Sequence, residues 1–272
     1  MSVENGVWIM KGRETSGGRL FRADRSGAET DWDHPECIHT VEELEEYIEA
    51  VGFLPLFANE VEGFSVEEWT DPGCWWTGDE DTDPWQWREI IARRQKIAYG
   101  KFFDKKAGFI SLKWLPYFVN SRRSGYDYDA RWQDGLSGRR EKLIMDFYVG
   151  EDANGDTLWK DERILSTELK KRAGFGKQGE KNYPGILTQL QMETYLVISD
   201  FERRKNKKGH EYGMAVSIMF PPEKLWGYEA VTAAYKESPM KSWQRIFDHV
   251  KEMYEEADDA AVMKIAGKTP EE

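Results

Sequence analysis

A chain of 272 residues with 40% hydrophobic and 14% aromatic residues can bury a sizeable core, which excludes a disordered protein. Its net charge of −12 excludes indiscriminate binding to nucleic acid or anionic membrane, because polyanions attract basic surfaces. The longest apolar stretches are too short to span a bilayer, and the N-terminus lacks a basic start followed by an apolar segment. The cysteines, Cys37 and Cys74, fit free thiols in a reducing compartment. We therefore expect a soluble cytoplasmic protein with no membrane partner.

Metal and cofactor sites have no support in the sequence. The histidine- and acid-containing stretch 31–39 matches no zinc spacing, and the chain has no glycine-rich phosphate loop. We expect no metal and no cofactor.

The first part of the chain divides into an arm and an aromatic-rich portion. Residues 1–39 are predicted to form an irregular N-terminal arm, because glycines interrupt it and no apolar period is sustained. Residues 40–138 are predicted to form an α+β portion. It begins with a helix that Thr40 caps and Gly52 ends, and Glu43 occupies the position of a capping box.

A second helix and a hairpin follow in this portion. Asp83 and Pro84 form a strong helix start, and the apolar positions after them predict a helix over 84–98. Residues 99–103 and 109–114 are rich in aromatic and β-branched side chains around a turn, so they are expected to pair as a hairpin.

The stretch 63–129 is unusually rich in aromatic residues, with five tryptophans between 69 and 87 set among carboxylates. Large aromatic side chains pack in a core or line a concave site, and core packing is the commoner case. Two interpretations stay open, a plain core and a ligand-binding surface. The surface would be lined by Trp75, Trp76, Trp85, Trp87, Arg88, Tyr99, Lys101, Arg122 and Arg123.

The arginine pair at 122–123 is the part of this surface with the clearest chemistry. Guanidinium groups bind phosphates or carboxylates, and the neighbouring tyrosines could stack on bases or sugars. The competing interpretation is internal pairing with nearby acids such as Asp127 and Asp129.

Residues 139–220 are predicted to form a winged-helix module. Three helical segments and then two strands around a basic turn, Arg203–Gly209, occur in the order of that motif. The boundary with the preceding portion is placed at Gly135–Gly138. Residues 221–272 are expected to contain further helices and a polar tail that frays.

Charge is distributed unevenly along the chain. From Arg163 to His210 there are eleven basic and five acidic residues, a balance of +6, which leaves −18 for the rest. Several cations on a turn can contact several phosphates at once. The predicted nucleic-acid-binding residues are Lys177, Lys181, Arg203, Arg204, Lys205, Lys207 and Lys208.

Four blocks of sequence, spread over most of residues 40–255, resemble the bacterial AlkZ-related group. They are GFLPLFANEVEGFSVEEWT, DPWQWREIIARRQKIAYGKFF, KAGFISLKWLPYFVNSRRSGYDYDARWQDG and LKKRAGFGKQGEKNYPGILTQLQMETYLVISDF. The resemblance implies winged-helix modules and a role linked to DNA, since the parent AlkZ-type glycosylases excise damaged bases. That family uses a glutamine–aliphatic–glutamine or glutamine–aliphatic–aspartate motif. Gln189-Leu190-Gln191 matches the first form, so the resemblance makes Gln189 and Gln191 the catalytic candidates. The motif of the family, however, lies nearer the start of the chain.

The favoured function is therefore a winged-helix protein that binds DNA and is related to repair glycosylases acting on damaged bases. Whether it is an enzyme stays open. A non-catalytic winged helix that binds an unidentified protein partner is the first alternative. A carbohydrate-binding or glycoside-hydrolysing protein that uses the tryptophan- and aspartate-rich stretch is the second.

Overall fold

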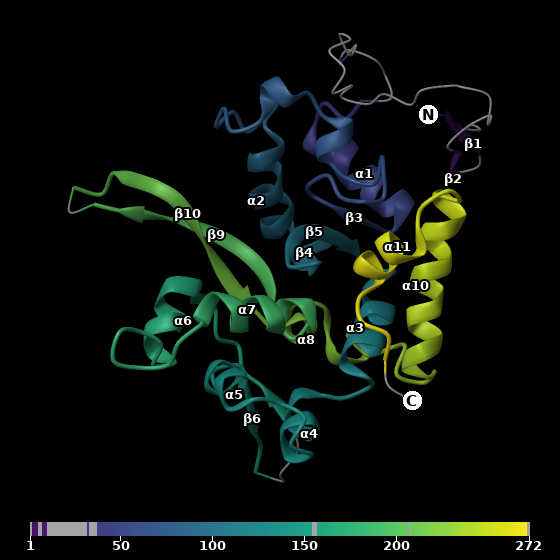
Figure 1. The fold of residues 1–272 in the computed structure, drawn as a ribbon. Helices are drawn as coiled ribbons and strands as arrows, with labels where there is room; N and C mark the ends of the chain where they lie inside the picture. Colours follow the sequence, from purple (N-terminus) through teal and green to yellow (C-terminus); the bar gives the residue numbers. More distant parts are fainter. Residues whose placement is uncertain are drawn as a thin grey trace.

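The computed structural model describes residues 2–4, 7–9, 32, 37–153, 157–206 and 208–270. The fold is a mixture of helices and small antiparallel sheets, as the sequence predicts (Figure 1). Its first half contains β1 (Ser2–Glu4), β2 (Val7–Ile9), α1 (Val41–Val51), β3 (Phe53–Pro55), α2 (Pro84–Arg94), β4 (Ile97–Phe103), β5 (Lys106–Ser111), α3 (Leu115–Arg123) and α4 (Tyr128–Gln133). Its second half contains α5 (Arg139–Met145), β6 (Val149–Glu151), β7 (Thr157–Trp159), β8 (Ile164–Leu165), α6 (Ser166–Arg172), α7 (Tyr183–Met192), β9 (Val197–Lys205), β10 (Glu211–Phe220), α8 (Pro222–Trp226), α9 (Tyr228–Val231), α10 (Pro239–Met253) and α11 (Asp259–Ala266).

The N-terminal arm is more regular than predicted over its first residues. Strands β1 and β2 pair antiparallel, with Val3 opposite Trp8. The prediction of an irregular arm is wrong for these two strands, because β-branched and aromatic residues favour extended backbone. The stretch considered for a metal site lies mostly outside the described residues.

Helix α1 has the ends that the sequence predicts. The Thr40 hydroxyl accepts a hydrogen bond from the Glu43 N–H at 3.2 Å, and Gly52 closes the helix at φ 88°. Helix α2 starts at Asp83 and Pro84 but ends at Arg94, four residues before the predicted end. The prediction was too long because Ile97 leaves the helix to pair with Ser111 in the hairpin β4–β5.

The core of the first half forms around Phe53. This residue lies in the sheet of order β3-β5-β4 and is fully buried. Its ring packs edge-to-face against Phe118 of α3 at 4.9 Å, against Trp114 at 5.3 Å and against Phe64 at 5.8 Å between centroids. Such contacts contribute about 0.5–1.5 kcal/mol each beyond the buried area, so this cluster fixes α3 to the sheet.

Residues 139–220 contain three helices, α5, α6 and α7, followed by the antiparallel hairpin β9–β10, in the predicted order. Strand β8 joins the hairpin to give a sheet of order β8-β10-β9. The short pair β6–β7 between α5 and α6 was not expected from the sequence. The identification of this unit as a winged helix stays a prediction, as does the boundary at 135–138.

The two halves share one hydrophobic core. Tyr99 of β4 contacts Phe201 of β9 at 6.1 Å between ring centroids, and Tyr128 of α4 contacts Tyr195, just before β9, at 5.3 Å. The base of the hairpin is therefore held by the first half, while its far end extends away from the body (Figure 1).

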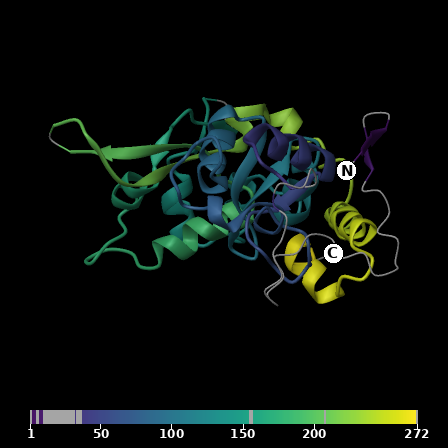
Figure 2. The ribbon, with the colours of Figure 1, turned by 90° about the horizontal axis from the view of Figure 1, so that it is seen from above.

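The C-terminal segment, which was predicted to be a polar tail, contains a helix over Asp259–Ala266. Helix α11 starts at Asp258, whose side chain accepts from the Ala260 N–H at 2.8 Å. It buries Val262 and Ile265, and with α10 it lies at the end of the molecule opposite the hairpin (Figure 2). The helix was not predicted because the abundant charges of the tail hide a short apolar repeat at helical spacing. Among the described residues no helix has the length and hydropathy needed to cross a membrane.

Candidate nucleic-acid interface

The hairpin β9–β10 has a tip that a single asparagine organises. The Asn206 side-chain oxygen accepts from the Lys208 N–H at 2.8 Å and from the His210 N–H at 3.1 Å, and Gly209 takes φ 80°. Because β9 continues to Lys205, the turn is shorter than the predicted 203–209 and the two arginines lie on the strand. Asparagine and glycine are the residues that such a turn requires.

The described basic side chains of the hairpin differ in whether they have a partner within the protein. Arg204 and Lys208 are exposed and form no ion pair with any side chain that the structure describes. Arg203 donates to the Gln86 side-chain oxygen of α2 at 3.3 Å, so it also connects the hairpin to the body. The side chains of Lys205 and Lys207 lie outside the described residues. Free cations at the end of a projecting hairpin are suited to phosphate contact.

Two large apolar side chains are exposed on β10, close to the hairpin tip that carries these cations. Tyr212 is 52% exposed and Met214 is 75% exposed. A register shift between Tyr212 and Val216, with Gly213 at φ 74°, twists the strand at this point. Exposed apolar residues beside charges are typical of surfaces that contact a partner.

The remaining predicted nucleic-acid contacts lie in the loop between α6 and α7. Lys177 is exposed, whereas the Lys181 ammonium donates to the Gly176 carbonyl at 2.8 Å and to the Lys177 carbonyl. Lys181 therefore also stabilises the loop. In Figures 1 and 2 this loop and the hairpin extend toward the same side of the molecule.

The two catalytic candidates have different surroundings on α7. Gln191 is buried; its oxygen accepts from the Lys101 N–H of β4 at 3.1 Å and its amide donates to the Leu187 carbonyl at 3.1 Å. Gln189 is exposed and donates to Glu193 at 2.7 Å. Only Gln189 can therefore contact a ligand.

Glu193, just after α7, was not among the predicted site residues. The oxygen that accepts from Gln189 also pairs with Arg131 at 3.0 Å, while its other oxygen is buried without a partner among the described residues. Burial raises the pKa of this carboxyl above its ordinary value, and Arg131 only partly offsets the shift. No local sequence signal marks Glu193, because the pairing with α4 spans 62 residues.

The nine predicted pocket residues do not line one open surface. Trp75, Trp87, Arg88, Tyr99 and Arg123 are buried, Trp85 and Arg122 are half-buried, and Trp76 and Lys101 are exposed. The two recesses beside the start of α5 are lined by none of the nine. In this structure, most of the stretch is core, which was the competing interpretation.

One buried acid, Asp83, explains how the loop 71–83, called the tryptophan loop below, folds. The Asp83 carboxylate accepts N–H bonds from Trp85 at 2.8 Å, Gly78 at 2.9 Å and Trp76 at 3.1 Å. It thereby caps α2 and holds the loop before it closed. Trp76 is left 64% exposed at φ 60°, with its ring against those of Trp75 and Trp85.

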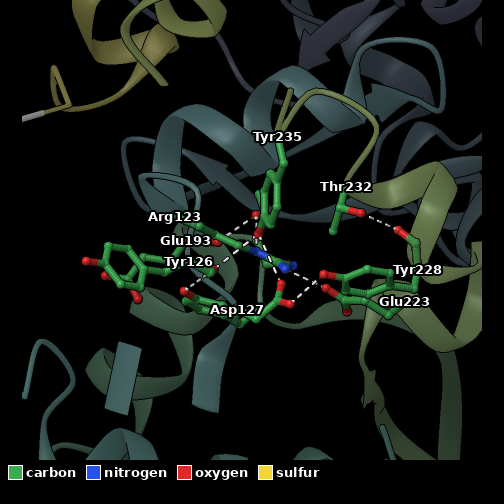
Figure 3. A network of polar contacts seen from close by, with 10 residues as sticks. Arg123, Tyr126, Asp127, Glu193, Glu223, Tyr228, Thr232 and Tyr235 are labelled. Carbon is green, nitrogen blue, oxygen red and sulfur yellow. Dashed lines mark hydrogen bonds and ion pairs between the residues drawn. The ribbon is translucent and has the colours of Figure 1, made fainter. Parts of the chain in front are cut away.

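Arg123 is held inside the protein. Its guanidinium donates to Glu223 at 2.5 Å and to the carbonyl and hydroxyl of Thr194 at 2.7 and 3.3 Å (Figure 3). Burial opposes the charge, but the Glu223 carboxylate outweighs it, so the pKa of Arg123 lies above its ordinary value. This arginine has a structural partner that the sequence interpretation did not identify.

Arg122 and Asp127 also have internal partners. Arg122 donates to the carbonyls of Met192 at 3.1 Å and Ile265 at 3.2 Å. Asp127 accepts hydrogen bonds from Tyr228 at 2.7 Å and Tyr235 at 3.3 Å, and Figure 3 shows both tyrosines converging on it. The two arginines therefore link α3 to the second half of the chain, including α11. They do not form an exposed pair.

A comparison with models of known protein families gives a match over most of the chain. Residues 38–267 match the family model described as AlkZ related. The matched region includes the tryptophan loop, the three helices α5–α7 and the hairpin. No curated protein and no solved structure matches the chain.

Proposed function

The chain belongs to the AlkZ-related family, and from that membership and its free basic hairpin we propose that it binds DNA in a repair pathway. The observation that carries the proposal is the exposure of Arg204 and Lys208 at the end of a hairpin in an otherwise acidic chain. We assign the unit 139–220 as a winged helix in which α7 lies toward the duplex and β9–β10 is the wing.

Electrostatics sets the orientation of the complex in this proposal. Asp79, Glu80 and Asp81 are exposed in the tryptophan loop and would repel phosphates. Repulsion between exposed charges is screened over about 10 Å at 0.1 M salt, so it weakens at the projecting hairpin. The proposal therefore places the duplex on the hairpin and predicts no contact between the duplex and the acidic loop.

Removal of the free hairpin charges tests this assignment. The double variant Arg204→Ala/Lys208→Ala should reduce the slope of log affinity against log salt by up to about 1.8, because each phosphate contact contributes about 0.9. The fold should be unchanged, since exposed charges contribute little to stability. The measurement is fluorescence anisotropy of a labelled duplex over a salt series.

The matched control removes two exposed lysines elsewhere, Lys113→Ala/Lys236→Ala. It changes the net charge by the same amount and should leave the slope close to that of the wild type. Absence of duplex binding by the wild type at low salt would refute the proposed function. Equal slopes for the two double variants would refute the role of the hairpin.

Base excision is the finer part of the proposal. Hydrolysis of an N-glycosidic bond requires that a water oxygen attack the sugar C1′ while the bond to the base breaks and its electron pair leaves with the base. Gln189, which is exposed, would orient that water, and Glu193, which accepts a hydrogen bond from Gln189, would hold its amide in place while the proton of the water leaves to solvent. Gln191 is excluded from this role because it is buried between α7 and β4.

Protein binding is the second candidate function, and the exposed Tyr212 and Met214 favour it. Side chains of this kind anchor protein interfaces when they enter a pocket of the partner. If the wild type binds no duplex but forms a complex with a protein partner, and Tyr212→Ala/Met214→Ala weakens that complex, the hairpin is a protein-docking element.

A further inference from the structure

A surface recess lies between the start of α5 and the loop that joins α6 to α7. Its volume is about 480 Å³, and the lining includes Arg139, Arg140, Gly174, Glu180 and Lys181. A second, adjoining recess shares the two arginines and Glu180. The arginines were not among the predicted site residues, because they precede the segment with the basic excess.

Both arginines are bound to the same carboxylate. Arg139 pairs with one Glu180 oxygen, and the Arg140 Nε donates to the other at 3.1 Å. These bonds hold the pKa of Glu180 below its ordinary value, so the carboxylate is charged and the three groups together carry +1. Exposed ion pairs stabilise a fold little, and one arginine would already neutralise Glu180.

The two guanidinium groups keep donors available. Arg140 uses only its Nε, and Arg139 uses only one terminal nitrogen, among the contacts that the described residues form. Arg139 is 73% exposed and Arg140 is 49% exposed at the side chain. Guanidinium forks of this kind match the paired oxygens of a phosphate.

The carboxylate that orients the arginines is fixed by a tightly closed loop. The Glu180 N–H donates to the Gly174 carbonyl at 3.0 Å, and its carbonyl accepts from the Gly176 N–H at 3.2 Å. At Gly179 a Cβ would lie 2.0 Å from the Gly174 carbonyl oxygen, so only glycine fits. The arginines are therefore held against a rigid loop.

This loop extends toward the same side of the molecule as the hairpin (Figures 1 and 2), and exposed Lys170, Lys171 and Lys177 lie on it or next to it in sequence. We infer that Arg139 and Arg140 form a second clamp for a backbone phosphate of bound DNA, placed across α7 from the hairpin. The inference rests on the proposed DNA-binding function and assigns it an additional contact. The duplex then spans the unit from the hairpin to α5, with α7 between the two clamps.

The test uses the double variant Arg139→Ala/Arg140→Ala in the duplex-binding salt series. The slope should fall by up to about 1.8, as expected for two lost phosphate contacts. Arg139→Lys/Arg140→Lys keeps the charges and should retain most of the slope while weakening binding, because lysine cannot form the bidentate contact. Thermal unfolding of the three proteins should coincide within a few degrees.

Each outcome has a distinct meaning. If the wild type binds no duplex, the proposed function fails. If the wild type binds and the alanine variant keeps the same slope, this inference alone fails. Titration with inorganic phosphate tests whether the two arginines bind a free anion instead. If the wild type binds phosphate and the alanine variant does not, while the duplex slope is the same in both, the assignment to DNA is overturned.

Discussion

Replacement of Glu223 by alanine should lower the free energy of unfolding by about 3–5 kcal/mol, because Arg123 would stay buried without a counter-ion. The relative exposure of the side chains is 0% for Arg123 and 1% for Glu223. The bonds from Arg123 to Thr194 would remain, but they do not neutralise its charge. Equilibrium denaturation in urea measures the change.

Two further variants separate this effect from the loss of any ion pair. Lys264→Ala removes an exposed pair with Glu60 and should leave stability close to that of the wild type. Arg123→Met/Glu223→Met removes both buried charges and should be less destabilised than Glu223→Ala. A Glu223→Ala protein that is as stable as the Lys264→Ala protein would contradict the buried-pair account.

Alanine substitution should reduce stability at Gln191 and base release at Gln189. Gln191→Ala removes two buried hydrogen bonds, one to the Lys101 N–H of β4 and one to the Leu187 carbonyl of α7. It should lower the free energy of unfolding by about 1–3 kcal/mol. Gln189→Ala, on an exposed side chain, should leave stability within about 0.5 kcal/mol. Release of methylated bases from alkylated duplex should fall by about 100-fold in Gln189→Ala, because a reacting water that is no longer held in place attacks less efficiently.

The catalytic half of this prediction can fail without the DNA-binding half. Wild-type protein that binds alkylated duplex but releases no base would refute the roles of Gln189 and Glu193 and leave the hairpin interface standing. Equal base release by wild type and Gln189→Ala would assign excision to other residues.

Local sequence signals predicted the element starts well. Thr40 and Asp83 are short polar side chains directly before helical periodicity, and each caps its helix as expected. The ends were less predictable, because a helix that could continue is stopped by pairing elsewhere, as Ile97 shows. The order of the three helices and the hairpin over 139–220 was predicted because it follows from patterns within the segment itself, whereas the short strands β6, β7 and β8 were not predicted.

Long-range partners explain what could not be predicted. Arg123 meets Glu223 across 100 positions of sequence, so a search among neighbouring acids could not find it. Arg139 meets Glu180 across 41 positions, and the recess beside them has no sequence signature. Core packing of the tryptophan stretch was one of two interpretations left open by the sequence, and only the fold shows that Asp83 leaves Trp76 exposed.

Hydrogen–deuterium exchange, measured with and without a DNA duplex, tests the central claim most directly, because it locates the interface on the unmodified chain. The account predicts slower exchange in peptides covering 203–212 and 174–185, and unchanged exchange in the acidic loop 71–83. Unchanged exchange in the hairpin, or protection concentrated in 71–83, would contradict it.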